Sequence, residues 1–297
     1  LAKTTGNFAV IIALKCETDF VAQNADFIKL TQDILDLAVA NNCKTLDEVK
    51  ALPMGNGTVQ DAVTDRSGIT GEKMELDGYL TVEGASTVVY NHMNRNGLCT
   101  IAAFNKEVNE QLAKEVAMQI AAMSPQYVSR EDISDEELAK MREITIDSAL
   151  NDVSSLPKPI QKDIFAEAFA SDALNAEDKA VLEEKQNDKY LFNFLSKEAI
   201  AALAAIAMSK KEAIMANKIF NGLVEGRISK QLKEVCLLDQ TYVMAADGKQ
   251  TVKAYLAEVS KEVGATVALK SFVRFETGEG IEKKEEDFAA EVAKQMK

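Results

Sequence analysis

The sequence has very few of the residues from which most active sites and metal sites are built. Its 297 residues include a single histidine, His92, and four cysteines without a C-x-x-C pair. One histidine excludes a site with several histidine ligands and argues against histidine-based nucleophilic catalysis. Neither a G-x-x-x-x-G-K-[ST] loop nor a G-x-G-x-x-G fingerprint is present to cradle a phosphate. We therefore expect no catalytic residues, no bound metal and no cofactor.

The cysteines also argue against a disulfide framework. Cys16, Cys43, Cys99 and Cys236 show no regular spacing. Cys16 and Cys99 fall in apolar segments with strand character, where a thiol acts as a small hydrophobic side chain. This usage is typical of a reducing compartment.

Positive charge is scarce, and long apolar runs are absent. Lysine and arginine number 34 against 47 aspartates and glutamates, which gives a formal net charge of −13. Binding a nucleic-acid backbone requires lysine and arginine to neutralise phosphates, so we expect no direct nucleic-acid partner. The sequence has no run of 18 apolar residues that could span a bilayer, and we expect no membrane partner. A protein partner is the remaining expectation.

The most informative segment that is present covers residues 8–23, F-A-V-I-I-A-L-K-C-E-T-D-F-V-A-Q. The apolar, β-branched beginning predicts a buried strand, and Asp19 and Phe20 follow directly after it. A turn at a strand end is held in fixed geometry, so an acidic residue beside an aromatic ring could press a rigid wedge into a partner. Alternatively, Phe20 is the first core residue of the next helix. We expect Phe20 and Asp19 to be exposed if the wedge interpretation is right.

A second segment resembles the first. Residues 267–291 contain another strand pattern that ends in Glu276-Thr277 and leads to Asp287-Phe288. Two related half-domains, each with a strand that feeds a helix, would explain this repetition. Val267, Leu269, Val273 and Phe275 should then face one way and be mostly buried.

Periodicity places further elements along the chain. Residues 27–39 and 109–123 have helical spacing, and residues 53–72 read as a loop around a weak helix. Strands at 87–90 and 98–104 are joined across an Asn-Gly pair, Asn96-Gly97, that would supply the positive φ values of a tight turn. These two strands could form a three-stranded antiparallel sheet with residues 8–16. His92 should make a structural hydrogen bond in this hairpin.

The second half of the chain has its own pattern. We expect strands at residues 242–244 and 267–275, a helix between them that carries Val252 and Val259, and a last helix with Phe288, Val292 and Met296. Residues 151–235 are almost wholly helix-forming, which predicts an antiparallel helical hairpin inserted into the second half-domain. The apolar stretch from Tyr190 to Leu195 either packs between its arms or faces a partner.

The resulting fold class is α+β, with two related half-domains, each a small antiparallel sheet with helices, and a helical hairpin insertion. The expected domains are residues 1–107 for the N-terminal half, 108–150 together with 236–297 for the C-terminal half, and 151–235 for the insertion.

Six motifs, in the same order, resemble the elongation factor Ts family. They are T-D-F-V at 18–21, Y-N-H at 90–92, V-A-M-Q-I-A-A at 116–122, V-E-G-R at 224–227, Q-T-Y-V-M at 240–244 and F-V-R-F-E-T-G-E-G-I-E-K at 272–283. The resemblance implies a guanine-nucleotide exchange factor that binds elongation factor Tu, GDP-bound or nucleotide-free. It also implies a bacterial cytoplasmic location rather than an organelle matrix.

The resemblance also implies a set of partner-binding residues. Asp19 and Phe20 would enter the GTPase domain and disturb the surroundings of the nucleotide-bound magnesium, while Thr18 and Val21 would shape the turn. Gln119 stands where the family has a histidine that touches the GTPase, and glutamine can hydrogen-bond but cannot ionise.

Three further residues match family contact segments. Val243 and Met244 match a segment that contacts another domain of the GTPase, and Gly71 aligns loosely with a contact loop.

Two departures leave alternatives open. The family normally begins with a small three-helix module, and this sequence starts after the position of that module. The region at about 160–215 is longer than the usual hairpin. A non-exchanging interaction protein that uses this insertion is therefore the alternative function, and a homodimer formed through the insertion is a further expectation. An enzyme is the least supported class.

Overall fold

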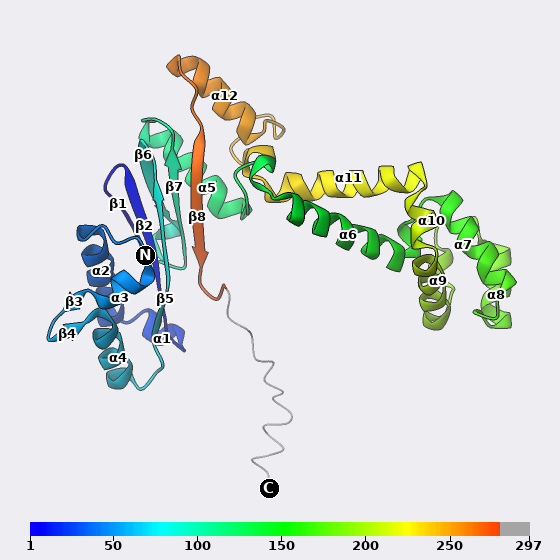
Figure 1. Cartoon of the computed structure of the whole chain (residues 1–297), viewed down its shortest axis with the longest axis horizontal. Coiled ribbons are helices and arrows are strands. Elements are labelled where there is room, and N and C mark those ends of the chain that lie inside the picture. Colours follow the sequence, from blue (N-terminus) through cyan, green and yellow to red (C-terminus); the bar gives the residue numbers. More distant parts are fainter. Residues whose placement is uncertain (280–297) are drawn as a thin grey trace, which may run out of the picture. The chain divides into compact units, whose positions relative to one another are not determined.

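The computed structural model describes residues 1–279. The chain divides into two compact units, which are treated separately below: Unit 1 comprises Leu1–Ser124 and Thr241–Lys297, and Unit 2 comprises Pro125–Gln240. Figure 1 labels the helices and strands of both units. The expected last helix and the Asp287-Phe288 repeat lie outside the described residues. The division into two related half-domains stays a prediction.

The first sheet of Unit 1 is built around β2 (Phe8–Lys15), which pairs antiparallel with β1 (Ala2–Thr4) and β5 (Glu75–Glu83). Successive side chains of β2 point to opposite faces. Phe8, Val10 and Ile12 pack on one face with the helices α2 (Ala25–Ala40), α3 (Leu46–Ala51) and α4 (Val59–Thr70). Ala9 and Ile11 belong to a second core on the other face. Burial on both faces explains why this strand is apolar from Phe8 to Leu14.

The second sheet of Unit 1 joins segments far apart in the sequence. β7 (Leu98–Phe104) lies between β6 (Ser86–Asn91) and β8 (Leu269–Glu276), and all pairs are antiparallel. Ile101 and Ala103 of β7 share a core with Ala9 and Ile11 of β2, so the two sheets pack face to face. Helix α5 (Glu110–Met123) covers the other face of this sheet, where the buried Thr100 hydroxyl donates to the Ala117 carbonyl at 3.1 Å.

The expected sheet of residues 8–16 with 87–90 and 98–104 is therefore wrong. β2 pairs with β1 and β5, and β8 takes the third place beside β7. Gly78 of β5 shows why this arrangement needs a specific residue: a Cβ at this position would lie 2.7 Å from Ala13 Cβ and 2.9 Å from the Phe275 ring. Strand pairing depends on such contacts between distant segments, which a local hydrophobic pattern does not encode.

Two local expectations are partly right. In the β6–β7 hairpin, positive φ occurs at Asn96 as expected, but also at Met93 and Asn94 and not at Gly97, because the connection is longer than a two-residue turn. His92 makes the expected structural hydrogen bond, between its Nδ1 and the Tyr90 hydroxyl at 2.9 Å.

The remaining expectation for β8 concerns its apolar side chains. Val267 and Leu269 are buried, whereas Val273 and Phe275 are half-buried and pack against the core between the sheets. The short helix α12 (Val252–Val263) precedes this strand.

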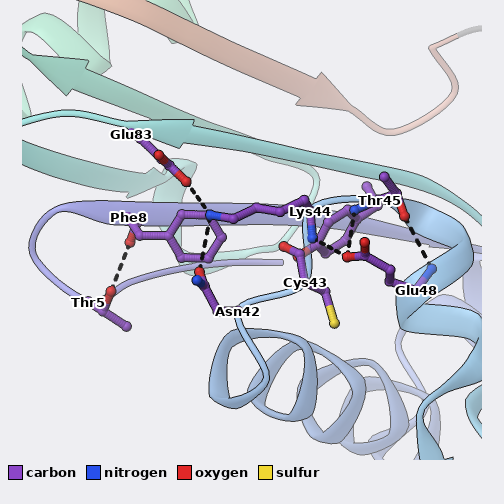
Figure 2. A network of polar contacts seen from close by, with 9 residues as sticks. Thr5, Phe8, Asn42, Cys43, Lys44, Thr45, Glu48 and Glu83 are labelled. Atoms are coloured by element: carbon purple, nitrogen blue, oxygen red, sulfur yellow. Dashed lines mark hydrogen bonds and ion pairs between the residues drawn. The ribbon is translucent and has the colours of Figure 1, made fainter.

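A polar network fixes the loop between α2 and α3 on the first sheet (Figure 2). The Lys44 ammonium lies 4.1 Å from the centroid of the Phe8 ring, donates to Asn42 and pairs with Glu83 of β5. Glu48 accepts from the backbone N–H of Lys44 at 2.6 Å and completes the capping box of α3. The Tyr79 hydroxyl donates to the carbonyl of Cys43, so β5 and this loop are joined twice.

Unit 2 is helical. α6 (Asp135–Asn151) and α11 (Lys218–Val235) pack side by side as its two long arms, and the shorter helices α7 (Lys158–Ala170), α8 (Ala176–Lys185), α9 (Lys197–Ser209) and α10 (Lys211–Met215) lie between them in the sequence (Figure 1). Its core includes Ile164, Leu203 and Phe220, none of which is measurably exposed. At the base, the Leu237 N–H donates to the Tyr127 carbonyl at 2.9 Å and closes the unit.

The apolar stretch from Tyr190 to Leu195 is divided between the interior and the surface of Unit 2, and a contact of its exposed side chains with a partner stays a prediction. Leu191 and Leu195 are buried in the core of Unit 2, and Phe192 packs against that core. Tyr190 and Phe194 remain 59% and 52% exposed, each with a lysine ammonium over its ring.

All four cysteines are free thiols. Among residues 1–279, no helix is both long and apolar enough to cross a bilayer.

Candidate functional site

The segment that follows β2 forms a single helical turn, α1 (Asp19–Ala22), on the surface of Unit 1. Thr18 caps this turn, and its hydroxyl accepts from the N–H of Val21 at 3.4 Å. Phe20 is 84% exposed and Asp19 is exposed beside it, while Val21 packs against the core below. The exposure expected of Phe20 and Asp19 is confirmed, and the alternative that Phe20 is a core residue is wrong.

The turn is held by a residue that sequence reasoning missed. The Glu72 carboxylate accepts from the N–H of Glu17 at 3.2 Å, from the N–H of Thr18 at 3.0 Å and from the Thr18 hydroxyl at 2.5 Å. Glu72 lies 54 residues from Thr18 in the sequence, and no local pattern marks it. The only signal nearby is the glycine before it, Gly71.

Gly71 ends α4 in a left-handed conformation, with φ of 73°. A residue with a side chain is strained there, so glycine is the natural choice for this position. The Ser67 hydroxyl donates to the Glu72 carbonyl at 2.6 Å and fixes the chain directly after the glycine. Gly71, a candidate contact residue, thus lies next to the residue that holds Thr18.

The thiol of Cys16 lies beneath the same turn and donates to the Thr18 carbonyl at 3.3 Å. Burial raises the pKa of Cys16, and the nearby negative charge of Glu72 raises it further. The thiol therefore stays neutral, and a neutral thiol is a poor nucleophile.

A second group of candidate residues lies on α5 and in the loop that precedes α12. The expected strand at residues 242–244 is wrong: Thr241 forms an isolated bridge with Thr251, and the chain then turns, with the Ala245 N–H donating to the Tyr242 carbonyl at 3.0 Å. Because the turn points Val243 and Met244 outward, these side chains are 46% and 51% exposed.

Gln119 lies directly beneath this loop. Its side chain is fully buried; its Oε1 accepts from the Val243 N–H at 2.8 Å and its Nε2 donates to the Thr241 carbonyl at 3.2 Å. The residue that matches the family's contact histidine is therefore part of the support for Val243 and not part of the exposed surface in this structure. The family resemblance matched Gln119 and Val243 to two separate contact segments, and the structure brings the two residues together.

Glu115, one helical turn before Gln119, holds the same loop through the side chain of Tyr242 and also contacts Tyr255 of α12. Its carboxylate accepts from the hydroxyls of Tyr242 at 2.7 Å and Tyr255 at 2.5 Å, and the two rings stack with centroids 4.2 Å apart. Partial burial acts to raise the pKa of Glu115, but hydrogen bonds from Tyr255, Gln111 and Tyr242 outweigh it and leave the pKa below its ordinary value. Burial and the Glu115 charge raise the pKa of Tyr242 to about 12.

The candidate residues thus form two groups on Unit 1. One group, which we call the wedge, lies beside the first sheet and consists of Thr18, Asp19, Phe20, Val21 and Gly71. The other group, which we call the platform, lies beside the second sheet and consists of Gln119, Val243 and Met244. Figure 1 shows α1 and α12 at different ends of the unit. Within residues 1–279 no cluster of three or more histidine, cysteine or acidic side chains could hold a metal ion.

An exposed aromatic side chain on a braced turn, with a second exposed apolar loop on a rigid support, defines a protein that acts by contacting another protein. The sequence pattern of the family described as Elongation factor TS matches residues 17–166 and 177–279, which include both the wedge and the platform. The chain belongs to this family. Its members are guanine-nucleotide exchange factors for elongation factor Tu and perform no covalent chemistry of their own.

Individual relatives are similar over most of the chain. Elongation factor Ts of Bacteroides thetaiotaomicron is 55% identical over 276 residues, which cover 89% of this chain and 78% of the relative. The protein of the same name from Phocaeicola vulgatus is 49% identical over 93% of this chain and 80% of its own length. That of Aeromonas hydrophila is 37% identical over 99% of this chain and 76% of its own length.

Proposed function

We propose that this exchange factor releases GDP from elongation factor Tu by inserting Phe20 into the GTPase domain, with Asp19 beside it and with Thr18 and Val21 fixing the turn. The observation that carries the proposal is the 84% exposure of an aromatic side chain on a braced turn. Exposing a phenylalanine to water costs free energy, and large exposed apolar groups commonly mark binding sites.

Linkage sets the magnitude that such a wedge must supply. If the factor weakens GDP binding by some ratio, GDP weakens binding of the factor by the same ratio. A ratio of 10⁴ corresponds to about 5.5 kcal/mol of coupling. A deeply inserted aromatic anchor commonly contributes about 2–4 kcal/mol. One inserted aromatic side chain together with a second contact surface can therefore supply a coupling free energy of this order.

The second surface in this proposal is the platform. Val243 and Met244 contact another domain of elongation factor Tu, and Gln119 keeps their backbone in place. Gly71, at the exposed end of α4, adds a contact within the wedge. Joining two contact sites on one chain raises the overall affinity through effective concentration.

The experiment follows the release of a fluorescent GDP analogue from elongation factor Tu. Phe20→Ala should lower the exchange rate at least tenfold, or about 1.4 kcal/mol, while the melting temperature stays unchanged. Ile144→Ala, which truncates a 57% exposed apolar side chain on α6, is the matched control and should exchange at the wild-type rate. Wild-type exchange by Phe20→Ala would exclude the wedge.

We propose further that a second copy of this chain docks on Unit 2. Tyr190 and Phe194 supply exposed aromatic surface there, and Phe169, Met215 and Ile219 add exposed apolar side chains. Sedimentation equilibrium of the wild type should report a dimer, and Phe194→Ser should shift it toward the monomer. If the wild type sediments as a monomer, these side chains instead suit the alternative of an interaction module for another protein.

The proposed location is the bacterial cytoplasm, because elongation factor Tu acts there and the similar proteins are bacterial. Fractionation of the source cells, with an antibody against the chain, tests this location.

A further inference from the structure

We infer that Glu72 is the positioning residue of the wedge: its carboxylate holds Thr18 so that Phe20 is presented in its binding geometry before the partner arrives. This inference rests on the proposed role of Phe20. Glu72 itself need not touch the partner, because its two oxygens are already directed at three donors of this chain.

Apart from Glu72, the wedge turn is held by the contact of Val21 with the core and by hydrogen bonds among residues close together in the chain. α1 has four residues, and none of them is buried. A single helical turn is unstable by itself because nucleation fixes several residues for one hydrogen bond. At its end, the Asn24 N–H donates to the Val21 carbonyl at 3.0 Å. At its beginning, Glu72 accepts both donors of Thr18 and so fixes the residue that caps the turn.

Glu72 is suited to this task because its own backbone is anchored. Its N–H donates to the Thr70 hydroxyl at 3.3 Å, and its carbonyl accepts from the Ser67 hydroxyl at 2.6 Å. Helix α4, which carries both residues, is fixed in the core through Val59 and Val63. In the described part of the chain no ion pair with lysine or arginine draws the Glu72 carboxylate away from the turn.

Pre-organisation of this kind changes affinity in a defined way. A turn that samples several conformations is ready to bind only in a fraction of molecules, and the apparent dissociation constant rises by the inverse of that fraction. Ordering the turn in advance also lowers the entropy lost on binding. Loss of the Glu72 contacts should therefore raise the concentration of factor needed for half-maximal exchange, while the rate at saturation stays near that of the wild type.

The nature of the contacts predicts which substitution can rescue. In Glu72→Gln, the amide oxygen can still accept the two N–H groups, and the amide nitrogen can donate to the Thr18 hydroxyl. Glu72→Ala has no acceptor at all. We expect Glu72→Ala to raise the half-maximal concentration about tenfold, which is about 1.4 kcal/mol, and Glu72→Gln to stay within about threefold because neutral hydrogen bonds are weaker than charge-assisted ones. Glu75→Gln, an exposed glutamate on β5, is the matched control and should behave as the wild type.

A double-mutant cycle shows whether Glu72 acts through Phe20. In the Phe20→Ala background, Glu72→Ala should cause no further loss, because there is no longer a ring to position. Full additivity of the two losses would overturn the inference, as would equal losses in Glu72→Gln and Glu72→Ala, which would mean that the negative charge itself meets the partner.

A readout without elongation factor Tu separates this inference from the proposed function. Hydrogen exchange of the Ala22 and Gln23 amides, which donate to Thr18 and Asp19, should become faster in Glu72→Ala, while the amides of β2 stay protected. Unchanged protection of these amides would overturn the inference even if Phe20 is the wedge. If Glu72→Ala proves unstable, Thr18→Val removes the Thr18 hydroxyl with its bonds to Glu72 and to the Val21 N–H, and should change the protection in the same direction; no change would likewise overturn the inference.

Discussion

The side chain of Gln119 holds the backbone of Val243. The Val243 N–H donates to Gln119 Oε1 at 2.8 Å, and Gln119 is fully buried while Val243 is 46% exposed. A side chain in the interior of Unit 1 thus fixes the position of a surface loop. Of these two residues, both matched to the family's contact motifs, one exposes an apolar side chain and the other supports its backbone from below.

Removal of the Gln119 side chain should lower both the stability of the fold and the affinity for elongation factor Tu. Gln119→Ala leaves the Val243 N–H and the Thr241 carbonyl without this partner, which costs about 1–3 kcal/mol for each buried unsatisfied group. We expect a lower free energy of unfolding in urea and weaker binding to elongation factor Tu. Gln119→His offers one donor and one acceptor in its neutral form and should retain more binding. Its binding should decline below about pH 6.5, because a protonated imidazole has no acceptor for the Val243 N–H. Equal binding by both variants at neutral pH would contradict this role.

Truncation of the platform side chains should affect binding alone. Val243 and Met244 are about half exposed, so the double variant Val243→Ala with Met244→Ala should change the free energy of unfolding by less than about 0.5 kcal/mol. Affinity for elongation factor Tu, measured by calorimetry, should fall at least fivefold, or about 1 kcal/mol. Leu256→Ala, a buried residue of α12, is the control for stability and should lower the melting temperature. Unchanged affinity would remove the platform from the binding surface.

Truncation of two phenylalanines of Unit 1 to alanine should lower the free energy of unfolding by very different amounts. Phe104 on β7 is not measurably exposed, and its truncation to alanine should cost about 3–5 kcal/mol of stability through lost burial and a cavity. Phe20→Ala should cost less than about 0.5 kcal/mol, because Phe20 is 84% exposed. Urea unfolding of both variants measures the difference. A large loss for Phe20→Ala would mean that the ring packs against the protein in solution.

Acid should weaken one polar contact of Unit 2. Asp178 is 4% exposed; its carboxylate accepts from the Ser196 N–H at 2.9 Å and from the Ser196 hydroxyl at 2.7 Å. These bonds, the backbone one foremost, hold the pKa of Asp178 below its ordinary value. Because the folded-state pKa is the lower one, the stabilisation is complete above about pH 4 and is lost as the pH falls through the folded-state value.

Urea unfolding at a series of pH values tests this contact. The free energy of unfolding of the wild type should exceed that of Asp178→Asn by about 1–3 kcal/mol near neutral pH, and this difference should become smaller below about pH 4. Asp172→Asn, an exposed aspartate before α8, is the control and should show no such gap. A gap of constant size at all pH values would contradict the role of the Asp178 charge.

The sequence alone predicted those structural features that depend on residues close together in the chain. The apolar run of β2 and the abrupt change at Thr18 predicted a buried strand with a turn after it, but they left open whether Phe20 is exposed or belongs to the core. The helix-forming composition of residues 151–235 predicted the helices α7 to α11 of Unit 2, whereas α6 lies before this range. Motif resemblance added the family and the candidate residues, among them Phe20 and Val243.

The partners of these elements were decided only by the tertiary structure. No local pattern places Glu72 on Thr18, or β8 rather than β2 beside β7. Residues 242–244 have the composition of a strand, but Gln119 and Gln250 take the hydrogen bonds of this segment and leave it as a loop. The physical reason is common to all three cases: a hydrogen bond or a buried face is satisfied by whichever group the folded chain brings within reach, and a local hydrophobic pattern does not reveal which group that is. Sequence by itself determined where the buried strand ends and the turn begins, and the tertiary structure determined that Phe20 is exposed and what holds the turn in place.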